Sequence, residues 1–156
     1  MHFLLETSPG EFLDKLTILE IKSERIRDPA KLANVTRELA VMRRLWDAAT
    51  GIDGEVPALV AELKSVNETL WVIEDRIRDC EATGRFDAEF VELARSVYQT
   101  NDHRAAIKRR INAILGSELV EEKSYTEYRK GRVRRRRPTR SAPPDGASHR
   151  PLPPDP

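Results

Sequence analysis

The sequence predicts an all-α domain of about four helices, packed as an antiparallel, coiled-coil-like hairpin or bundle, with a disordered C-terminal tail. Apolar residues recur at spacings of three and four through the first 128 residues, which is the period of an amphipathic helix. Capping residues and prolines mark where helices begin. Beyond residue 128 arginine, proline and serine dominate, and such a composition buries too little apolar surface to fold. We therefore expect a helical domain at 1–128 and a disordered basic tail at 129–156.

The first helix is expected to begin at Ser8. The Ser8 hydroxyl can accept a hydrogen bond from the amide of Glu11, and the Glu11 carboxylate can bond back to the amide of Ser8. Pro9 suits the first helical position, where its missing N–H costs nothing. Apolar residues on more than one side predict burial on more than one side. The helix should stop before Asp28-Pro29, because the residue before a proline leaves the helical region.

Asp28-Pro29 then begins a second helix, which we expect to end near Thr50-Gly51. The third helix is the most regular and should end at Gly84. Its seam has eight successive apolar positions: Val56, Leu59, Leu63, Val66, Leu70, Ile73, Ile77 and Cys80.

A fourth helix is expected from about Asp87 to Leu115, with Gly116 as its stop. The third and fourth helices are the longest, and we expect them to form an antiparallel hairpin. Met1–Glu6 and Leu119–Tyr125 could each be a short strand or an extended arm across the bundle.

Charge is divided unevenly along the chain. The net charge of +1 combines −6 up to Tyr128 with +7 from Arg129 onward. No apolar run approaches the roughly 20 residues of a membrane-spanning helix. The N-terminus lacks the basic region and cleavage site of a signal peptide. These features favour a cytoplasmic protein.

Familiar enzyme signatures are missing from the sequence. The one cysteine excludes an internal disulfide, and Cys80 reads as a small core side chain. The three histidines are scattered, so no metal site is predicted. The sequence contains no phosphate-binding or dinucleotide-binding glycine loop. We expect no cofactor and assign no catalytic residue, which favours a protein that is not an enzyme.

Polar residues interrupt the apolar pattern of the fourth helix. Asn101 and Arg104 stand where the spacing calls for apolar side chains, and a polar stripe runs along the third helix. Antiparallel packing could bring these groups together with residues of the first helix. They could be interhelical ion pairs, with Asn101 setting the register of a polar core, or they could form a ligand-binding cleft. The candidate cleft residues are Asp14, Lys15, Asn67, Trp71, Glu74, Arg78, Asn101, Asp102 and Arg104.

The start of the first helix has a second interpretation. With Gly10 in its first turn, the amides near Ser8 could hold a phosphate or carboxylate. Glu11 argues against an anion there, because its own charge already satisfies the positive helix end. Capping is therefore the preferred interpretation.

The tail carries the strongest charge in the chain. Eight of the 12 residues from Arg129 to Arg140 are basic, enough to contact nucleic acid or anionic membrane without sequence preference. A solvated, solubilising tail is the preferred interpretation, and attraction to the acidic helices is a third alternative. A surplus apolar helix face would produce a homodimer or bind another protein.

Five segments of the chain resemble a family of short bacterial proteins known as domain of unknown function 6165. They are SPGEFLDKLTILEIK (8–22), VNETLWVIED (66–75), ARSVYQTND (94–102), KRRIN (108–112) and EEKSY (121–125). The similarity covers about Met1 to Tyr128 and excludes the tail. It implies no reaction, but it implies an association with glycosyltransferase or surface-polysaccharide systems.

Two functions follow as expectations. The first is a non-catalytic cytoplasmic interaction or accessory protein that binds another protein or itself. The alternative is a helical domain that binds or acts on an anionic small molecule through the polar cleft between helices.

Overall fold

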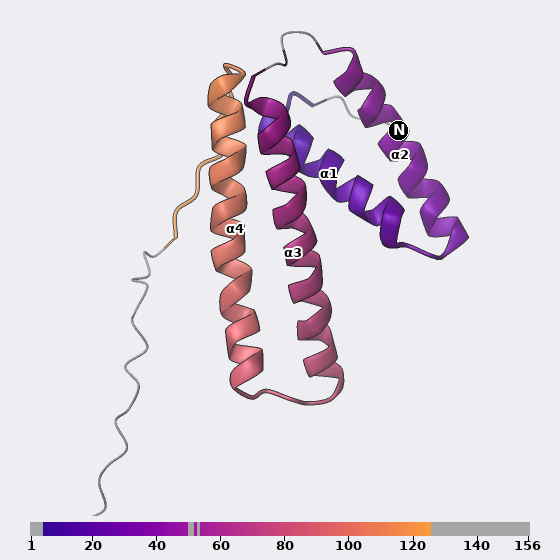
Figure 1. Cartoon of the computed structure of the whole chain (residues 1–156), viewed down its shortest axis with the longest axis vertical. Coiled ribbons are helices and arrows are strands. Elements are labelled where there is room, and N and C mark those ends of the chain that lie inside the picture. Colours follow the sequence, from indigo (N-terminus) through magenta and orange to yellow (C-terminus); the bar gives the residue numbers. More distant parts are fainter. Residues whose placement is uncertain (1–4, 50–51, 53, 126–156) are drawn as a thin grey trace, which may run out of the picture. The chain divides into compact units, whose positions relative to one another are not determined.

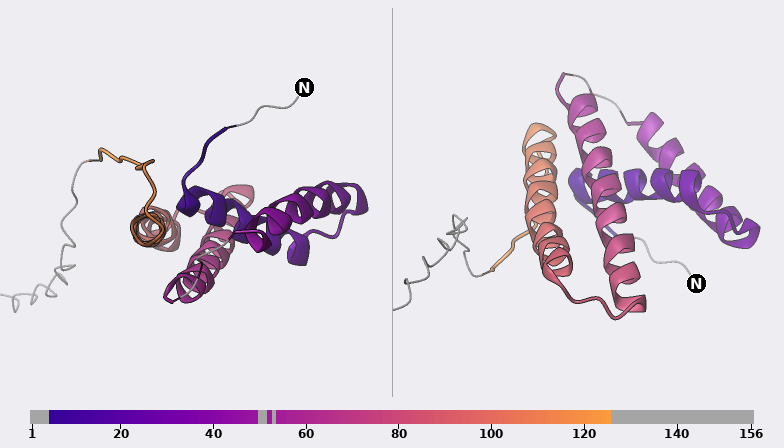
Figure 2. Two further views of the ribbon diagram at one scale, coloured as in Figure 1. Left: turned by 90° about the horizontal axis from the view of Figure 1, so that it is seen from above. Right: turned by 60° about the horizontal axis from the view of Figure 1, so that its bottom comes forward.

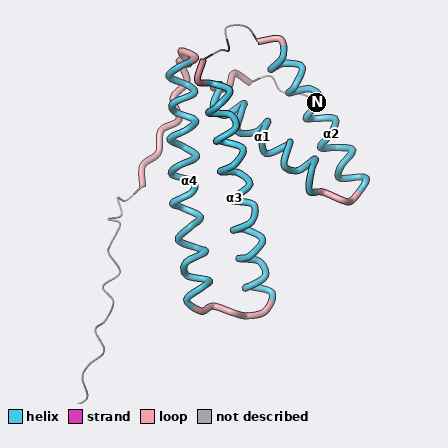
Figure 3. Tube along the Cα trace, in the orientation of Figure 1, coloured by secondary structure: helices cyan, strands magenta, loops and turns pink. Residues whose placement is uncertain are grey.

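The computed structural model describes residues 5–49, 52 and 54–125, and four helices account for most of them. The helices follow one another in the order α1 (Pro9–Arg25), α2 (Pro29–Asp47), α3 (Val56–Ala82) and α4 (Ala88–Ile114) (Figure 1). No strand occurs among these described residues (Figure 3). The predicted all-α fold is confirmed. The tail at 129–156, with the disorder and the partners predicted for it, lies outside the described part of the chain.

Short polar side chains begin three of the helices, as the sequence predicts. The Ser8 hydroxyl accepts a hydrogen bond from the amide of Glu11 at 3.3 Å. Asp28 accepts one from the amide of Lys31 at 2.9 Å, and Asp87 caps α4 in the same way. These side chains satisfy amides that have no partner within the helix.

Glycines in the left-handed conformation follow the two long helices. Gly84 has φ 63° after α3, and Gly116 has φ 64° after α4. This conformation lets the chain turn back and satisfy the last carbonyls of a helix, at little cost for glycine. The α2 helix ends at Asp47, before the predicted end near Thr50-Gly51, and those two residues are outside the described ranges.

The α1 helix is the centre of the packing. Among the described helices, it contacts each of the other three, whereas α2 packs only against α1. The α3 and α4 helices lie side by side and antiparallel, with α1 between this hairpin and α2 (Figures 1 and 2). Burial of α1 on more than one side is thus confirmed. The main core joins all four helices: Leu13, Leu16, Leu19, Leu39, Met42, Val56, Leu59, Leu63, Val66, Leu70, Ile107 and Ile111.

A smaller core closes the hairpin near the α3–α4 connection. Ile73, Cys80 and Leu93 are buried there, and Ile77 packs against them. The Cys80 side chain is fully buried, so the prediction that it is a core residue is confirmed.

The segment after α4 is an extended arm without strand structure in its described residues. Of the two alternatives for Leu119–Tyr125, the strand is therefore wrong. The arm brings Glu121 back to α4, where its carboxylate lies 2.7 Å from the Nζ of Lys108. None of the helices seen in the described ranges is both long enough and apolar enough to span a membrane.

Candidate functional site

A buried polar network lies where α1 crosses the α3–α4 hairpin. Asn67 of α3 is only 4% exposed, and its side-chain nitrogen donates to Asp14 at 2.8 Å and to the Thr17 hydroxyl at 3.0 Å. Both partners are buried residues of α1. Buried polar groups are costly unless they are hydrogen-bonded, so these bonds fix how α1 lies on α3.

Arg104 of α4 completes this network. Its Nη1 donates to the Oδ1 of Asn67 at 3.3 Å, and its Nε lies 4.0 Å from an oxygen of Asp14. The amide of Asn67 therefore bonds to α1 through its nitrogen and to α4 through its oxygen. The negative charge of Asp14 faces a positive charge, which offsets the cost of burying it.

Lys108 is the centre of a second group of polar contacts, one turn further along α4. Its side chain is 6% exposed, and its Nζ bonds to Glu11 and, at 2.7 Å, to Glu121. Asp14 lies 3.9 Å away. Burial by itself lowers the pKa of Lys108 through desolvation, but hydrogen bonds to Glu11 and Glu121 outweigh it, and the pKa is raised overall. The hydrogen bond from Lys108 lowers the pKa of Glu121 to about 2.

The predicted anion site at the start of α1 is occupied by the protein itself. The amide of Gly10 donates to the Oδ1 of Asn112 on α4 at 2.7 Å. The amide of Glu11 is bonded to the Ser8 hydroxyl. The Glu11 carboxylate, which we expected to bond back to Ser8, instead accepts a hydrogen bond from Lys108. The arrangement is the capping one, with a contact to α4 that the sequence did not indicate.

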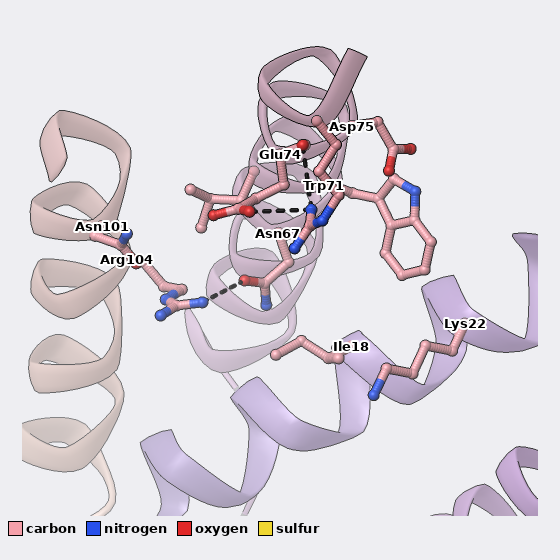
Figure 4. Close-up of a pocket in the computed structure, with 10 residues that line it drawn as sticks. Ile18, Lys22, Asn67, Trp71, Glu74, Asp75, Asn101 and Arg104 are labelled. Atoms are coloured by element: carbon pink, nitrogen blue, oxygen red, sulfur yellow. Dashed lines mark hydrogen bonds and ion pairs between the residues drawn. The ribbon is translucent and has the colours of Figure 1, made fainter. Parts of the chain in front are cut away.

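A pocket of about 640 Å³ opens beside the buried network, between α1, α3 and α4 (Figure 4). Six of the nine predicted cleft residues line it: Asn67, Trp71, Glu74, Arg78, Asn101 and Arg104. Ile18, Lys22, Leu70 and Asp75 complete the lining. The six come from α3 and α4, whereas α1 contributes Ile18 and Lys22 in place of the predicted Asp14 and Lys15. Ligand binding stays a prediction.

Some charged groups of the pocket are paired, and others are not. Arg78 bonds to the carboxylate of Glu74 at 3.1 Å, one turn back on the same helix. Arg25 stacks on the Trp71 ring, with its guanidinium carbon 5.6 Å from the ring centroid. The side chains of Lys22 and Asp75 have no hydrogen-bond or ion-pair partner among the described residues.

Three of the nine predicted residues do not line the pocket. Asp14 lies beneath it in the network, and Asp102 is exposed on α4. Lys15 is directed to the other side of α1, where it pairs with Glu38 of α2 at 2.6 Å.

The register-setting role expected of Asn101 belongs to another residue. The side chain of Asn101 donates to the carbonyl of Val97 in its own helix at 3.0 Å and has no hydrogen bond to another helix within the described ranges. Asn67 joins α3 to both α1 and α4. Sequence periodicity alone could not choose between the two asparagines, because both stand beside an apolar seam.

The pocket residues missing from the predicted cleft are Ile18, Lys22, Leu70 and Asp75. Three residues of the neighbouring polar contacts were also missed: Lys108, Glu121 and Asn112. The family resemblance included all three in its motifs, but nothing in their spacing indicated burial. Within the described ranges, no group of three or more histidine, cysteine, aspartate or glutamate side chains could hold a metal ion.

The fold and the site define a class: a four-helix, all-α domain with a paired polar network in its core and a polar pocket beside it. The chain belongs to the family of unknown function DUF6165, whose model matches residues 3–131. The resemblance in the sequence is thereby confirmed. Comparison with curated proteins and with solved structures finds no match for this chain.

Proposed function

We propose that this chain is a non-catalytic helical domain that binds an anionic small molecule in the pocket between α1, α3 and α4. One observation carries the proposal: Arg104 lines the pocket while Asn67 and Asp14 hold its guanidinium from below. A guanidinium held in this way recognises a carboxylate or phosphate without first having to be ordered.

The rest of the pocket supports the same function. A guanidinium has five N–H donors, and the network beneath Arg104 uses only some of them. Ile18, Leu70 and Trp71 offer apolar surface to the body of a ligand. A concave pocket with apolar walls and a few convergent polar groups is the usual form of a small-molecule site.

The proposal includes no reaction. The residues that line the pocket include no cysteine, serine or histidine. The carboxylate of Glu74 is paired with Arg78. We therefore propose binding and no bond-making step.

A thermal-shift screen tests this function. The probes are inorganic phosphate, pyrophosphate, sugar phosphates and short mono- and dicarboxylates. We expect at least one of them to raise the Tm of the wild-type chain, and Arg104→Gln to abolish the rise. Arg109→Gln is the matched control, because Arg109 is an exposed arginine of the same helix. Should Arg104→Gln unfold the chain, Arg78→Gln tests the same pocket from an exposed position. A response that none of these substitutions alters contradicts the proposal.

A second candidate function is that of an accessory protein that binds another protein or a second copy of itself. Val41 and Leu45 are 45% and 59% exposed and lie one turn apart on α2, which packs against α1 alone. The family resemblance would place such a protein with glycosyltransferase or surface-polysaccharide systems. The test is affinity capture and sedimentation of the chain lacking 129–156. A specific complex or dimer that Val41→Lys with Leu45→Lys abolishes supports this role, and a monomer without a partner contradicts it.

A further inference from the structure

We infer that the pocket takes an amphoteric ligand, with a carboxylate or phosphate at one end and a protonated amine at the other. This inference rests on the proposed function and specifies its ligand. Lys22 of α1 and Arg104 of α4 supply cations to the pocket, whereas both of its carboxylates, Glu74 and Asp75, come from α3. The third cation, Arg78, also lies on α3 and pairs with Glu74. Figure 4 shows the two carboxylates above the Asn67 amide, Arg104 beside it and Lys22 below it.

The cationic end is suited to an anionic group. Arg104 is held by Asn67 and Asp14, and Lys22 has no partner among the described side chains. A carboxylate or phosphate placed here gains charge-assisted hydrogen bonds from both cations. Lys22 can move to meet the ligand, because its long side chain is held by no other bond.

The acidic end is suited to a cationic group. Asp75 is an exposed lining residue without a partner in the described part of the chain, whereas Glu74 is paired with the exposed Arg78. The negative charge of a simple anion in the pocket would be repelled by these carboxylates. The apolar tail of such a ligand would displace the water around the carboxylates without replacing the hydrogen bonds that this water makes. A protonated amine avoids both costs.

Apolar surface joins the two ends. Ile18 of α1 and Leu70 and Trp71 of α3 line the pocket beside the charged groups. The guanidinium of Arg25 lies over the Trp71 ring in a cation–π contact. A short methylene chain between the two charged groups would lie against this surface.

Three matched ligands test the inference: 6-aminohexanoate, hexanoate and hexylamine. The two tryptophans supply the signal, because Trp71 lines the pocket and Trp46 lies elsewhere, against Phe12. We expect 6-aminohexanoate to shift the indole N–H resonance of Trp71 and leave that of Trp46 in place. Its affinity should exceed that of either single-ended ligand at least tenfold, because only this ligand satisfies both ends.

Two substitutions test which residues bind each end of the ligand. Asp75→Asn should lower the affinity for 6-aminohexanoate toward that of hexanoate, without weakening the binding of hexanoate. Arg104→Gln should weaken both. Asp79→Asn, an exposed aspartate one turn further along α3, is the control and should change neither.

The outcomes separate this inference from the proposed function. Hexanoate binding as tightly as 6-aminohexanoate, or insensitivity to Asp75→Asn, overturns the amphoteric ligand and leaves an anion-binding pocket. Absence of binding by all three ligands also overturns the inference. The anion screen, with Arg104→Gln, then decides the proposed function by itself.

Discussion

The amide of Gly10 donates a hydrogen bond of 2.7 Å to the side chain of Asn112, which ties the first turn of α1 to the last turn of α4. The two helices approach so closely that a Cβ atom on residue 10 would lie 2.7 Å from the carbonyl oxygen of Lys108. The obstacle is backbone, so one of the two helices would have to move.

Gly10→Ala should therefore destabilise the domain by about 1–3 kcal/mol, the usual cost of overpacking. A loss of stability would be informative, because replacing glycine by alanine within a helix otherwise raises the stability. Urea denaturation followed by circular dichroism measures the effect. A variant as stable as the wild type would show that α1 and α4 separate without cost at this point.

Removing the amide of Asn67 should destabilise the domain by about 2–3 kcal/mol, because Asn67→Ala leaves buried Asp14 and Thr17 without their donor. Asn34→Ala is the matched control, since Asn34 is exposed on α2. Its effect should stay below about 0.5 kcal/mol. Equal losses for the two variants in chemical denaturation would mean that the network contributes nothing beyond helix propensity.

Two lysines in ion pairs should differ sharply when each is replaced by methionine. The Lys108 side chain is 6% exposed and that of Lys15 is 60% exposed. Lys108→Met removes the buried cation that Glu11, Asp14 and Glu121 share and should cost about 2–4 kcal/mol. Lys15→Met breaks only a solvated pair with Glu38 and should cost less than about 0.5 kcal/mol. Thermal unfolding of both variants checks the ranking, and the reverse ranking would refute it.

Acid should release the C-terminal arm. The pKa of Glu121 falls from 4.5 to about 2 in the folded chain, so the folded state favours the charged carboxylate. Its contribution is complete above pH 4.5 and is lost as the pH falls through about 2. The free energy of unfolding of Glu121→Gln should lie about 1 kcal/mol below the wild type at neutral pH, after allowance for solvent screening. The two values should converge near pH 2.

Glu122→Gln provides the control for that comparison, because Glu122 is an exposed residue of the same arm. At neutral pH its free energy of unfolding should stay close to that of the wild type. A pH-independent difference for Glu121→Gln would argue that the contact with Lys108 does not form in solution.

Cys80 should react slowly with a thiol reagent while the hairpin is closed. It is fully buried beside Ile73 and Leu93, so labelling requires that the hairpin opens. Cys80→Ala with Val72→Cys moves the thiol to an exposed position on the same helix and should label without delay. Equal labelling rates for the two thiols in native buffer would show that this end of the hairpin is open.

The sequence predicted most of the fold, because the signals that determine it are local. Ser8, Asp28 and Asp87 cap helices within three residues along the chain, and the α3 seam repeats without interruption. The end of α2 was less well predicted, since no capping glycine follows Asp47 directly. Six of the pocket residues were foreseen, because they share the faces that border the apolar seams.

The remaining site residues depend on how α1 crosses the hairpin, and periodicity does not encode that crossing. A lysine such as Lys108 resembles a surface residue until the arm after α4 brings Glu121 to it. Lys15 is the opposite case, a predicted cleft residue that lies elsewhere. Its neighbour Asp14 is buried in the network, whereas Lys15 points to α2. Asn67 and Asn101 are equivalent in the sequence, and only the position of α1 distinguishes them.

The contact between Gly10 and Asn112 has a consequence for synthesis of the chain, since 102 residues separate its two ends. Translation proceeds from the N-terminus, so α1 leaves the ribosome long before the helix that completes its packing. Leu13 and Leu16 are buried in the finished domain, but until α4 is made they lack part of the apolar surface that packs against them. Truncated chains that end before α4 should therefore be prone to aggregate and to recruit chaperones.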